Sequence, residues 1–318
     1  MTSAYTFIDN LIRRGLCLFI RPFHTPDLQT YSRGNDFPDK HFLVIRRFAP
    51  SNAGLLSFVM TTIGWIRYAE KHGLTPVVDM QTWLNQCLDW WEIGRKNAWE
   101  FYFEQPAGFS LADIRHAKHI TIANATLAPD HVRLLDLITS DSLTQKIRLL
   151  VKKYIRIKED SLCQFENSEL EAALNTPGSR VIGIRARGTD YNTVQPAGHA
   201  IQPCAKDFLK HLSTLKTYEK IYLASEDTSI INPLKRALGS KLILAKQSIP
   251  DYSGGWMPNC RVKGYSRRKE GAGYLKAIAD LSRCPILLAG QNNGTAIAYL
   301  LSNGFEKFDL IQLGNYPS

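Results

Sequence analysis

Short apolar segments and amphipathic segments alternate regularly in the second half of the chain. The apolar segments have the length of strands and lie at 180–185, 220–224, 241–244, 285–289 and 309–313. The helix-like segments between them lie at 204–215, 228–238, 272–282 and 293–302. Neighbouring parallel strands need crossover connections, and strands covered on both faces read as continuous apolar runs. The alternation therefore predicts a doubly wound parallel sheet.

The first half of the chain contains a β–turn–α–β unit of the same kind. Residues 22–40 are rich in Pro, Gly, Asp and Asn, which predicts a loop. A strand, a polar turn, an apolar-periodic helix and a second strand follow, at 41–47, 50–54, 55–72 and 75–80. Such a unit opens a parallel sheet.

The rest of the first half is less regular. Residues 81–115 are rich in aromatic side chains, 118–123 predict a third strand, and 130–158 predict a helical segment. A chain of 318 residues has the length of two ordinary α/β domains. We predict two Rossmann-like domains, 1–165 and 166–318, with a ligand-binding cleft between them.

The composition, 44% apolar and 21% charged, is typical of a soluble globular protein. The formal net charge of +10 favours an acidic partner: nucleic acid, anionic lipid or a phosphorylated substrate. The basic residues form short scattered clusters, each of which is also typical of a solvated surface. Nucleic-acid binding requires basic residues on one surface with aromatics between them, so the scatter argues against it.

The six cysteines are scattered and form neither a C-x-x-C pair nor a zinc-binding spacing. We therefore expect free thiols, no metal site and a cytoplasmic protein. No apolar stretch reaches the ~18 to 20 residues of a membrane span. Residues 5–21 predict an amphipathic helix, which either packs on the protein or contacts the anionic inner face of a membrane weakly.

Polar side chains cluster where the predicted strand 180–185 ends. Arg185 and Arg187 have the same parity, so both point to one face of the strand. Two guanidinium groups on one face repel each other unless an anion or a carboxylate neutralises them. A diphosphate does so well, because guanidinium forks match phosphate oxygens. The alternative is a structural pair with Asp190.

Two further acidic positions are candidates for ligand binding. Ser225 and Asp227 follow the strand 220–224, where acidic residues can bind ribose hydroxyls, although Asp227 can equally cap the next helix. Asp280 lies in the last turn of its predicted helix, where the helix dipole disfavours a carboxylate. Asp280 therefore needs a partner, either an arginine or a donor group of a ligand.

A small polar turn joins the strand 285–289 to the next helix. Small residues allow a helix N-terminus to present backbone N–H groups to phosphate. The turn contains Asn292, Asn293, Gly294 and Thr295.

Taken together, these motifs resemble the donor-binding half of the α1,6-fucosyltransferase and protein O-fucosyltransferase superfamily, which includes the nodulation fucosyltransferases. The resemblance covers 179–303 in order and spacing. It rests on the strand ends at 185–190 and 225–227, the Asp280 helix and the turn at 291–293. In the first half, the turn containing Asn52 and Gly54 resembles the family's Gly-rich turn.

The resemblance implies a GT-B-like fold, with an acceptor-side domain at 1–165 and a nucleotide-sugar donor-binding domain at 166–318. It also implies a metal-independent, inverting glycosyltransferase without a cofactor. By the resemblance, Arg187 binds the donor diphosphate, Asp280 contacts the nucleotide base, and the turn at 291–295 binds phosphate. The turn with Asn52 and Gly54 would also contribute to donor binding. The first-choice donor is GDP-fucose, and the acceptor is a hydroxyl of a glycan or a lipid-linked saccharide.

The chain departs from the family pattern at two positions. Arg185 stands where the family has a histidine that lies by the guanine. The resemblance therefore does not fix the nucleotide base of the donor. Gln195 falls near the acid proposed as catalytic base in the α1,6 enzymes, and an amide cannot take a proton at neutral pH. His199 matches a histidine of those enzymes and is our candidate base, with Asp190 as its competitor. The alternatives are a nucleotide-sugar-binding protein without transferase activity and a transferase that uses another nucleotide sugar.

Overall fold

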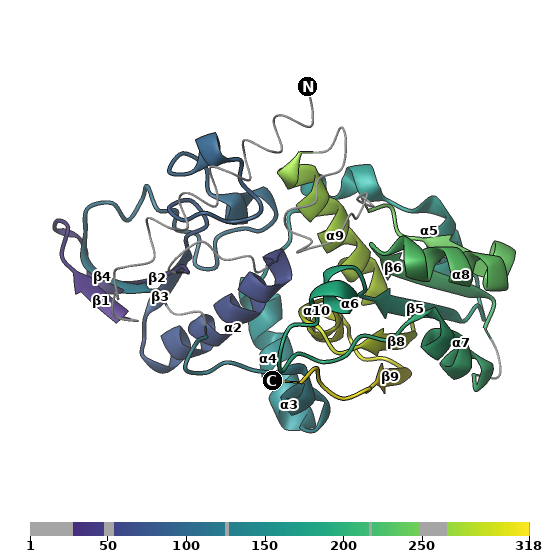
Figure 1. Ribbon diagram of the computed structural model, residues 1–318. Coiled ribbons are helices and arrows are strands. Elements are labelled where there is room, and N and C mark those ends of the chain that lie inside the picture. The colour runs from purple at the N-terminus through teal and green to yellow at the C-terminus, as the bar shows by residue number, and fades with distance from the viewer. Residues whose placement is uncertain (1–27, 48–53, 125–126, 216–217, 248–265, 318) are drawn as a thin grey trace. The chain divides into compact units, whose positions relative to one another are not determined.

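The computed structural model describes residues 28–47, 54–124, 127–215, 218–247 and 266–317. The chain divides into two compact units, Met1–Ser161 and Leu162–Ser318, hereafter unit 1 and unit 2 (Figure 1). This division falls four residues before the predicted boundary. The predicted helix at 5–21 lies outside the described residues, and the cleft between the two halves stays a prediction.

Unit 1 contains a four-stranded sheet in the order β1-β4-β2-β3. Its strands are β1 (Leu28–Tyr31), β2 (Asp36–Ile45), β3 (Thr75–Val78) and β4 (Ala117–Ala123). Strands β2, β3 and β4 are parallel, and β1 runs antiparallel to β4. The loop predicted at 22–40 is therefore wrong where β1 and the first half of β2 lie. These strands are mostly exposed, so backbone pairing defines them without an apolar pattern.

The helices of unit 1 are α2 (Leu55–Lys71), α3 (Leu134–Ile138) and α4 (Asp141–Tyr154). The helical segment predicted at 130–158 is interrupted, because Ser140 begins a new helix. Its hydroxyl accepts a hydrogen bond from the backbone N–H of Leu143 at 3.3 Å. A serine at this position caps a helix start, so the chain forms two helices where the apolar period indicated one.

The aromatic-rich segment of unit 1 contacts the carboxyl end of edge strand β3. It includes the short 3-10 helices η1 (Trp90–Glu92) and η2 (Ala98–Phe101). The side-chain amide of Gln105 accepts from the Val78 N–H at 2.8 Å and donates to the Val78 carbonyl at 2.9 Å. Asn97 accepts from the Met80 N–H at 3.0 Å. Side-chain amides thus satisfy the backbone groups at the end of edge strand β3.

Unit 2 contains a five-stranded sheet in the order β7-β6-β5-β8-β9. All of its neighbouring strands are parallel, which confirms the predicted doubly wound sheet. The strands are β5 (Val181–Ala186), β6 (Lys220–Ser225), β7 (Leu242–Leu244), β8 (Ile286–Gly290) and β9 (Lys307–Ile311). The strand order reverses between β5 and β8, and ligands of such sheets bind at the carboxyl ends of strands at this point.

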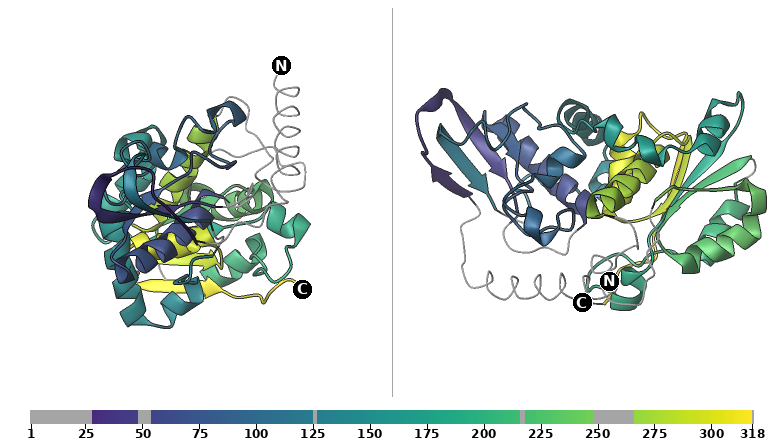
Figure 2. Two further views of the ribbon diagram at one scale, coloured as in Figure 1. Left: turned by 90° about the vertical axis from the view of Figure 1, so that its left-hand side faces the viewer. Right: turned by 90° about the horizontal axis from the view of Figure 1, so that it is seen from above.

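Helices cover both faces of this sheet (Figure 2). Helices α7 (Ala205–Ser213) and α8 (Thr228–Leu238) pack on the face that contains Ile182 and Ile184. Helix α9 (Arg267–Leu281) packs on the other face of β5 and β6, and α10 (Asn293–Leu301) contacts α9. Since side chains alternate along a strand, Arg185 belongs to the α9 face.

Two short helices of unit 2 were not predicted, α5 (Ser168–Asn175) and α6 (Asp190–Val194). Both are too short for a periodic signal. Among the described residues, no helix has the length and apolar character needed to cross a membrane.

Candidate functional site

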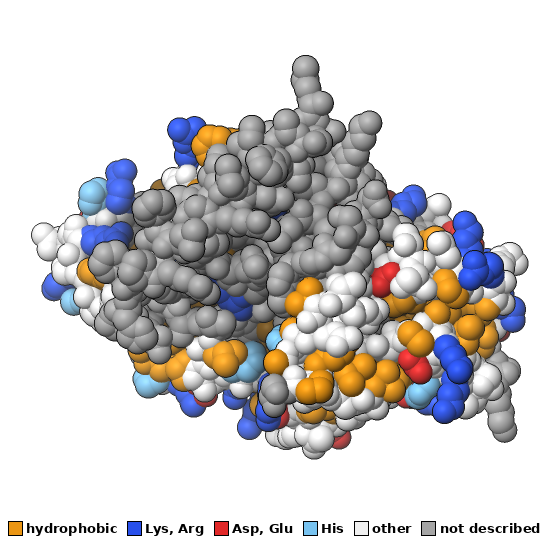
Figure 3. Space-filling view, in the orientation of Figure 1, with side chains coloured by type: hydrophobic (Ala, Val, Ile, Leu, Met, Phe, Trp, Pro, Cys, Tyr) orange, Lys and Arg blue, Asp and Glu red, His pale blue; other side chains and the backbone are white. Residues whose placement is uncertain are grey.

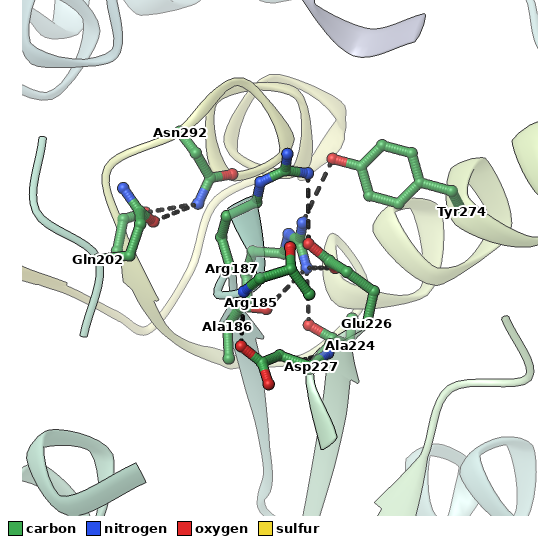
Figure 4. A network of polar contacts seen from close by, with 12 residues as sticks. Arg185, Ala186, Arg187, Gln202, Ala224, Glu226, Asp227, Tyr274 and Asn292 are labelled. Carbon is green, nitrogen blue, oxygen red and sulfur yellow. Dashed lines mark hydrogen bonds and ion pairs between the residues drawn. The ribbon is translucent and has the colours of Figure 1, made fainter. Parts of the chain in front are cut away.

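The candidate site lies at the carboxyl ends of β5, β6 and β8, where the strand order of unit 2 reverses. The site is built from Arg185 and Arg187 after β5, Glu226 after β6, Tyr274 on α9 and Asn292 before α10. Figure 4 shows both arginines converging on Glu226. The sequence predicted the two arginines and the turn, and the structure brings them together at one edge of the sheet.

Arg185 is fully buried and ties β5 to β6. Its Nη1 donates to the carbonyls of Ala186 at 2.9 Å and Ala224 at 3.0 Å, and to Glu226 Oε2 at 3.0 Å. The guanidinium also lies 5.2 Å from the centre of the Tyr274 ring. These contacts make Arg185 part of the framework of the site, and its predicted contact with the donor stays a prediction.

Glu226 is the carboxylate that the two arginines share. Its Oε1 lies 3.3 Å from Arg187 Nη1, while the Glu226 side chain is 8% exposed and that of Arg187 is 22% exposed. Burial raises the pKa of Glu226, but Arg185 and Arg187 outweigh burial and hold that pKa below its ordinary value. Two cations share one anion, so these three side chains carry an excess positive charge at a partly exposed edge.

Sequence reasoning missed Glu226 as the charge partner and named Asp190 instead. The side chain of Asp190 lies outside the described residues, and its backbone begins α6. The signal for Glu226 was present, because Glu226 follows the strand next to β5. Tyr274 was also missed, since nothing in the sequence links it to β5.

Replacing Glu226 with glutamine is expected to destabilise the protein by about 2–3 kcal/mol, because the buried Arg185 and the partly exposed Arg187 would then share a neutral amide. Since the folded pKa of Glu226 is lowered, the ion pair stabilises the fold above the ordinary pKa of 4.5, and this is lost as pH falls through the folded value. Urea unfolding of Glu226→Gln at pH 7 and pH 4 measures both effects.

The control for this substitution is Glu306→Gln. Glu306 pairs with Arg180 at 3.1 Å, but its side chain is 60% exposed. An exposed pair contributes below about 1 kcal/mol. Equal losses of unfolding free energy in the two variants would show that the Glu226 pair has no special weight.

Asp227 caps a helix and fixes the turn after β5. Its Oδ1 accepts the Ser229 N–H at 2.8 Å at the start of α8, and its Oδ2 accepts the Thr189 N–H at 2.6 Å. The Ser225 hydroxyl accepts the Asp227 N–H at 3.2 Å. The capping interpretation of Asp227 is thus what the structure describes, and ribose binding by Ser225 or Asp227 stays a prediction.

Gly188 is packed against this carboxylate. A Cβ at Gly188 would lie 1.9 Å from Asp227 Oδ2, so a methyl group would displace the side chain that holds Thr189. Gly188→Ala is expected to lower the free energy of unfolding by about 1–3 kcal/mol. The matched variant is Gly54→Ala, where the nearest atom would be Gln86 Oε1 at 4.0 Å. Thermal melts that rank the two variants equally would contradict the packing argument.

The turn before α10 is closed by Asn292. Its Oδ1 accepts the Thr295 N–H at 3.0 Å, and its Nδ2 donates to Gln202 Oε1 at 3.2 Å. Thr295 is buried and donates to the Gly290 carbonyl at 2.7 Å, whereas Asn293 is exposed. A Cβ on Gly294 would lie 2.7 Å from the Tyr274 hydroxyl and 3.0 Å from Arg185 Nε, so a larger residue at the start of α10 would force these side chains to shift.

His199 lies on an exposed loop that is linked to Arg187 through Tyr191. Its Nδ1 is 3.3 Å from the Tyr191 hydroxyl, and the Arg187 guanidinium lies 5.1 Å from the centre of the Tyr191 ring. The Tyr316 N–H donates to the His199 carbonyl at 2.8 Å, so the C-terminal segment supports the loop. Gln195 is exposed and left-handed, with φ 46°.

Asp280 is not brought together with the two arginines. It lies six residues after Tyr274, about 9 Å further along α9. It is buried, pairs with Lys276 and accepts from the Tyr222 hydroxyl at 3.1 Å. Burial raises its pKa, although Lys276 and Tyr222 oppose this. Arg283 Nη1 also lies 3.8 Å from Asp280 Oδ1, so the structure gives Asp280 the predicted arginine together with a lysine, and contact with a nucleotide base stays a prediction.

The remaining predicted residues belong to unit 1. Gly54 is exposed and precedes α2, and Asn52 lies outside the described residues. Within the described ranges, no group of three or more His, Cys, Asp or Glu side chains has an arrangement that could hold a metal ion.

No protein-family model matches this chain, and no curated protein matches its sequence. Among solved structures, the chain is similar to the NodZ α-1,6-fucosyltransferase co-crystallised with GDP, with 13% identity, a TM-score of 0.49, and coverage of 83% of this chain and 93% of that one. The same enzyme soaked with GDP-fucose gives 14% identity, a TM-score of 0.48 and the same coverage. Fucosyltransferase NodZ from Bradyrhizobium gives 14% identity, a TM-score of 0.47, and coverage of 83% and 93%.

Proposed function

We propose that the protein is a glycosyltransferase that uses a nucleotide diphosphate sugar as donor. The observation that carries this proposal is the position of Arg187. It is partly exposed at the carboxyl edge where the strand order reverses, and it shares Glu226 with a fully buried arginine. An excess positive charge at that edge, beside the N-terminus of α10, suits a diphosphate.

The proposed reaction is a single displacement with inversion. The oxygen of an acceptor hydroxyl attacks the anomeric carbon, the bond from that carbon to the diphosphate oxygen breaks, and a base takes the hydroxyl proton. Negative charge gathers on the leaving diphosphate in the transition state. Arg187 would stabilise that charge, with backbone N–H groups at the start of α10 as further donors.

His199 is the proposed base. Its Nδ1 contacts the Tyr191 hydroxyl, and its Nε2 makes no hydrogen bond among the described residues. Nε2 is therefore the nitrogen that would take the proton of the acceptor hydroxyl. An imidazole can take a proton near neutral pH. Asp190 is the competing candidate.

GDP-fucose is the first donor to test, because the motifs of unit 2 resemble those of fucosyltransferases. Arg185 replaces a histidine of that pattern, which lies by the guanine. The nucleotide base of the donor is therefore best identified by experiment. A ligand that binds only the folded protein raises its melting temperature. We expect one of the GDP, UDP, CDP and dTDP sugars to raise the melting temperature well above the others. A panel without any shift would contradict the proposal.

The proposed mechanism uses neither a metal nor a cofactor. Arg187 and the N-terminus of α10 would neutralise the leaving diphosphate as a divalent cation does in other enzymes. Transfer should therefore continue in excess EDTA. Activity that is lost on chelation and restored by Mg²⁺ or Mn²⁺ would contradict this mechanism.

The proposed acceptor is a hydroxyl of a glycan or of a lipid-linked saccharide, as in polysaccharide synthesis. We place the protein in the cytoplasm, with weak contact to anionic lipid at the inner face of a membrane. Flotation with anionic vesicles at low and high salt tests that contact.

A nucleotide-sugar-binding protein without transferase activity is the second candidate. It is favoured by Gln195, which stands where an acid is expected. Donor binding without hydrolysis or transfer by the purified protein would support it. Nucleic-acid binding is not proposed, because the basic clusters are scattered along the sequence. On the described part of the face in Figure 3, Lys and Arg side chains lie in separate groups with uncharged and apolar side chains between them.

A further inference from the structure

Two donor side chains meet at the carboxyl edge of the sheet in unit 1. Arg46 follows β2 and Asn124 follows β4, and the Arg46 N–H donates to the Ala123 carbonyl at 3.0 Å. This bond extends the strand pairing by one position, so the two side chains lie next to each other. Arg46 Nε donates to Asn124 Oδ1 at 2.5 Å.

The other end of the Asn124 amide is a buried donor without a partner. Asn124 is 3% exposed, and its Nδ2 makes no hydrogen bond within the described residues. Exchanging the positions of the amide oxygen and nitrogen would not give the NH2 group a partner. It would place the NH2 group against the Nε–H of Arg46, and both groups are donors. Buried polar groups are normally hydrogen-bonded, so this NH2 group is a candidate donor to a ligand.

The Arg46 guanidinium is half-buried and makes no ion pair in the part of the chain that the structure describes. Its Nη1 lies 3.5 Å from the Thr82 hydroxyl. The neighbouring carboxylate, Asp79, accepts the N–H groups of Gln81 at 2.8 Å and Thr82 at 2.9 Å. It also accepts the Thr82 hydroxyl. Asp79 thus accepts from local donors and, among the described residues, makes no ion pair with Arg46.

Arg47, the next residue in the chain, contributes a second positive charge to unit 1. It is 3% exposed and donates to the hydroxyls of Ser57 at 3.1 Å and Thr61 at 2.9 Å. Burial lowers its pKa to about 10, so it remains charged at neutral pH.

We infer that Arg46 and Asn124 form a binding site for an oxyanion, either a carboxylate or a phosphate. The fork of a guanidinium matches two oxygens of such a group, and the Asn124 NH2 group supplies a third donor. The identity of the oxyanion rests on the proposed function: the oxyanion belongs to the acceptor. The acceptor is then an acidic saccharide, either a uronic acid or a sugar phosphate.

The test is a ligand-detected NMR titration of the full-length protein with sodium glucuronate, inorganic phosphate and glucose. The variants are Arg46→Met and Asn124→Asp. The aspartate keeps an acceptor for Arg46 Nε, so the fold is retained, but its charge neutralises the guanidinium and repels an anion. The matched controls are Arg115→Met, an exposed arginine of unit 1, and Arg187→Met, which removes the cation of the unit 2 site.

We expect glucuronate or phosphate to bind and glucose not to bind, with the tighter anion identifying carboxylate or phosphate as the group recognised. Both Arg46→Met and Asn124→Asp should weaken that anion at least about tenfold, Arg115→Met should retain it, and Arg187→Met should retain the part of the binding that Arg46→Met removes. Absence of anion binding to the unaltered protein, unchanged affinity in both variants, or loss in Arg187→Met alone would overturn the inference. The titration uses no nucleotide, so failure of the donor assignment would leave its result intact.

Discussion

Arg187→Lys is expected to lower kcat/KM for sugar transfer by a factor of about 10² to 10³ while the fold is retained. Lysine keeps the charge but lacks the planar fork that contacts two phosphate oxygens. It also cannot reproduce both the Nη1 contact with Glu226 and the stacking over Tyr191. Steady-state kinetics with the donor that the panel selects, together with a thermal melt, measure both parts of this prediction.

The control is Arg180→Lys. Arg180 lies just before β5 and pairs with Glu306 at 3.1 Å, with its side chain 45% exposed. This exposed pair should tolerate lysine without loss of activity. An Arg187→Lys variant with near-normal donor affinity and turnover would contradict the assignment of Arg187.

His199→Ala is expected to lower kcat by a factor of about 10² to 10⁴ with little change in donor affinity. A hydroxyl that attacks the anomeric carbon must lose its proton, and His199 is the imidazole that the structure links to Arg187 through Tyr191. The acidic limb of the pH–rate profile should disappear as well. Kinetics over a pH series and direct donor titration separate these effects.

His211→Ala is the matched control. His211 lies on α7 of the same unit, and its Nδ1 is 3.1 Å from Oδ2 of Asp309 on β9. It should change kcat little. If His199→Ala weakens donor binding and leaves kcat nearly intact, His199 is a binding residue. The base would then be Asp190 or a group of the acceptor-side domain.

The parallel sheet of unit 2 was predictable because its strands are buried on both faces. Continuous apolar runs such as 220–224 identify strands of this kind directly. Strand β1 and the start of β2 were not predictable, since exposed strands depend on backbone pairing with β4 and carry no apolar pattern. The break before α4 was readable from Ser140, a residue that favours helix starts.

The candidate site was predictable in part for a related reason. Arg185 and Arg187 could be placed on one face from their parity alone. The sequence also predicted that an anion or a carboxylate neutralises these two side chains. That the carboxylate is Glu226 depends on which strand lies next to β5. The contact of Tyr191 with His199 depends on how the loop after α6 folds back on that helix. The unpaired amide of Asn124 depends on Arg46, which is far away in the sequence. Contacts between distant segments carry no local sequence signal.

The most direct test of the donor site compares a nucleoside diphosphate with its monophosphate. Isothermal titration calorimetry in the presence of EDTA gives the affinities for the diphosphate and for the monophosphate. Both ligands carry the nucleotide base that the panel of nucleotide sugars identifies. If Arg187 binds the diphosphate, the unaltered protein should bind the diphosphate at least about tenfold more tightly than the monophosphate, and Arg187→Met should abolish that preference. Equal affinities in the unaltered protein, or a preference that survives in Arg187→Met, would contradict a diphosphate site at the end of β5.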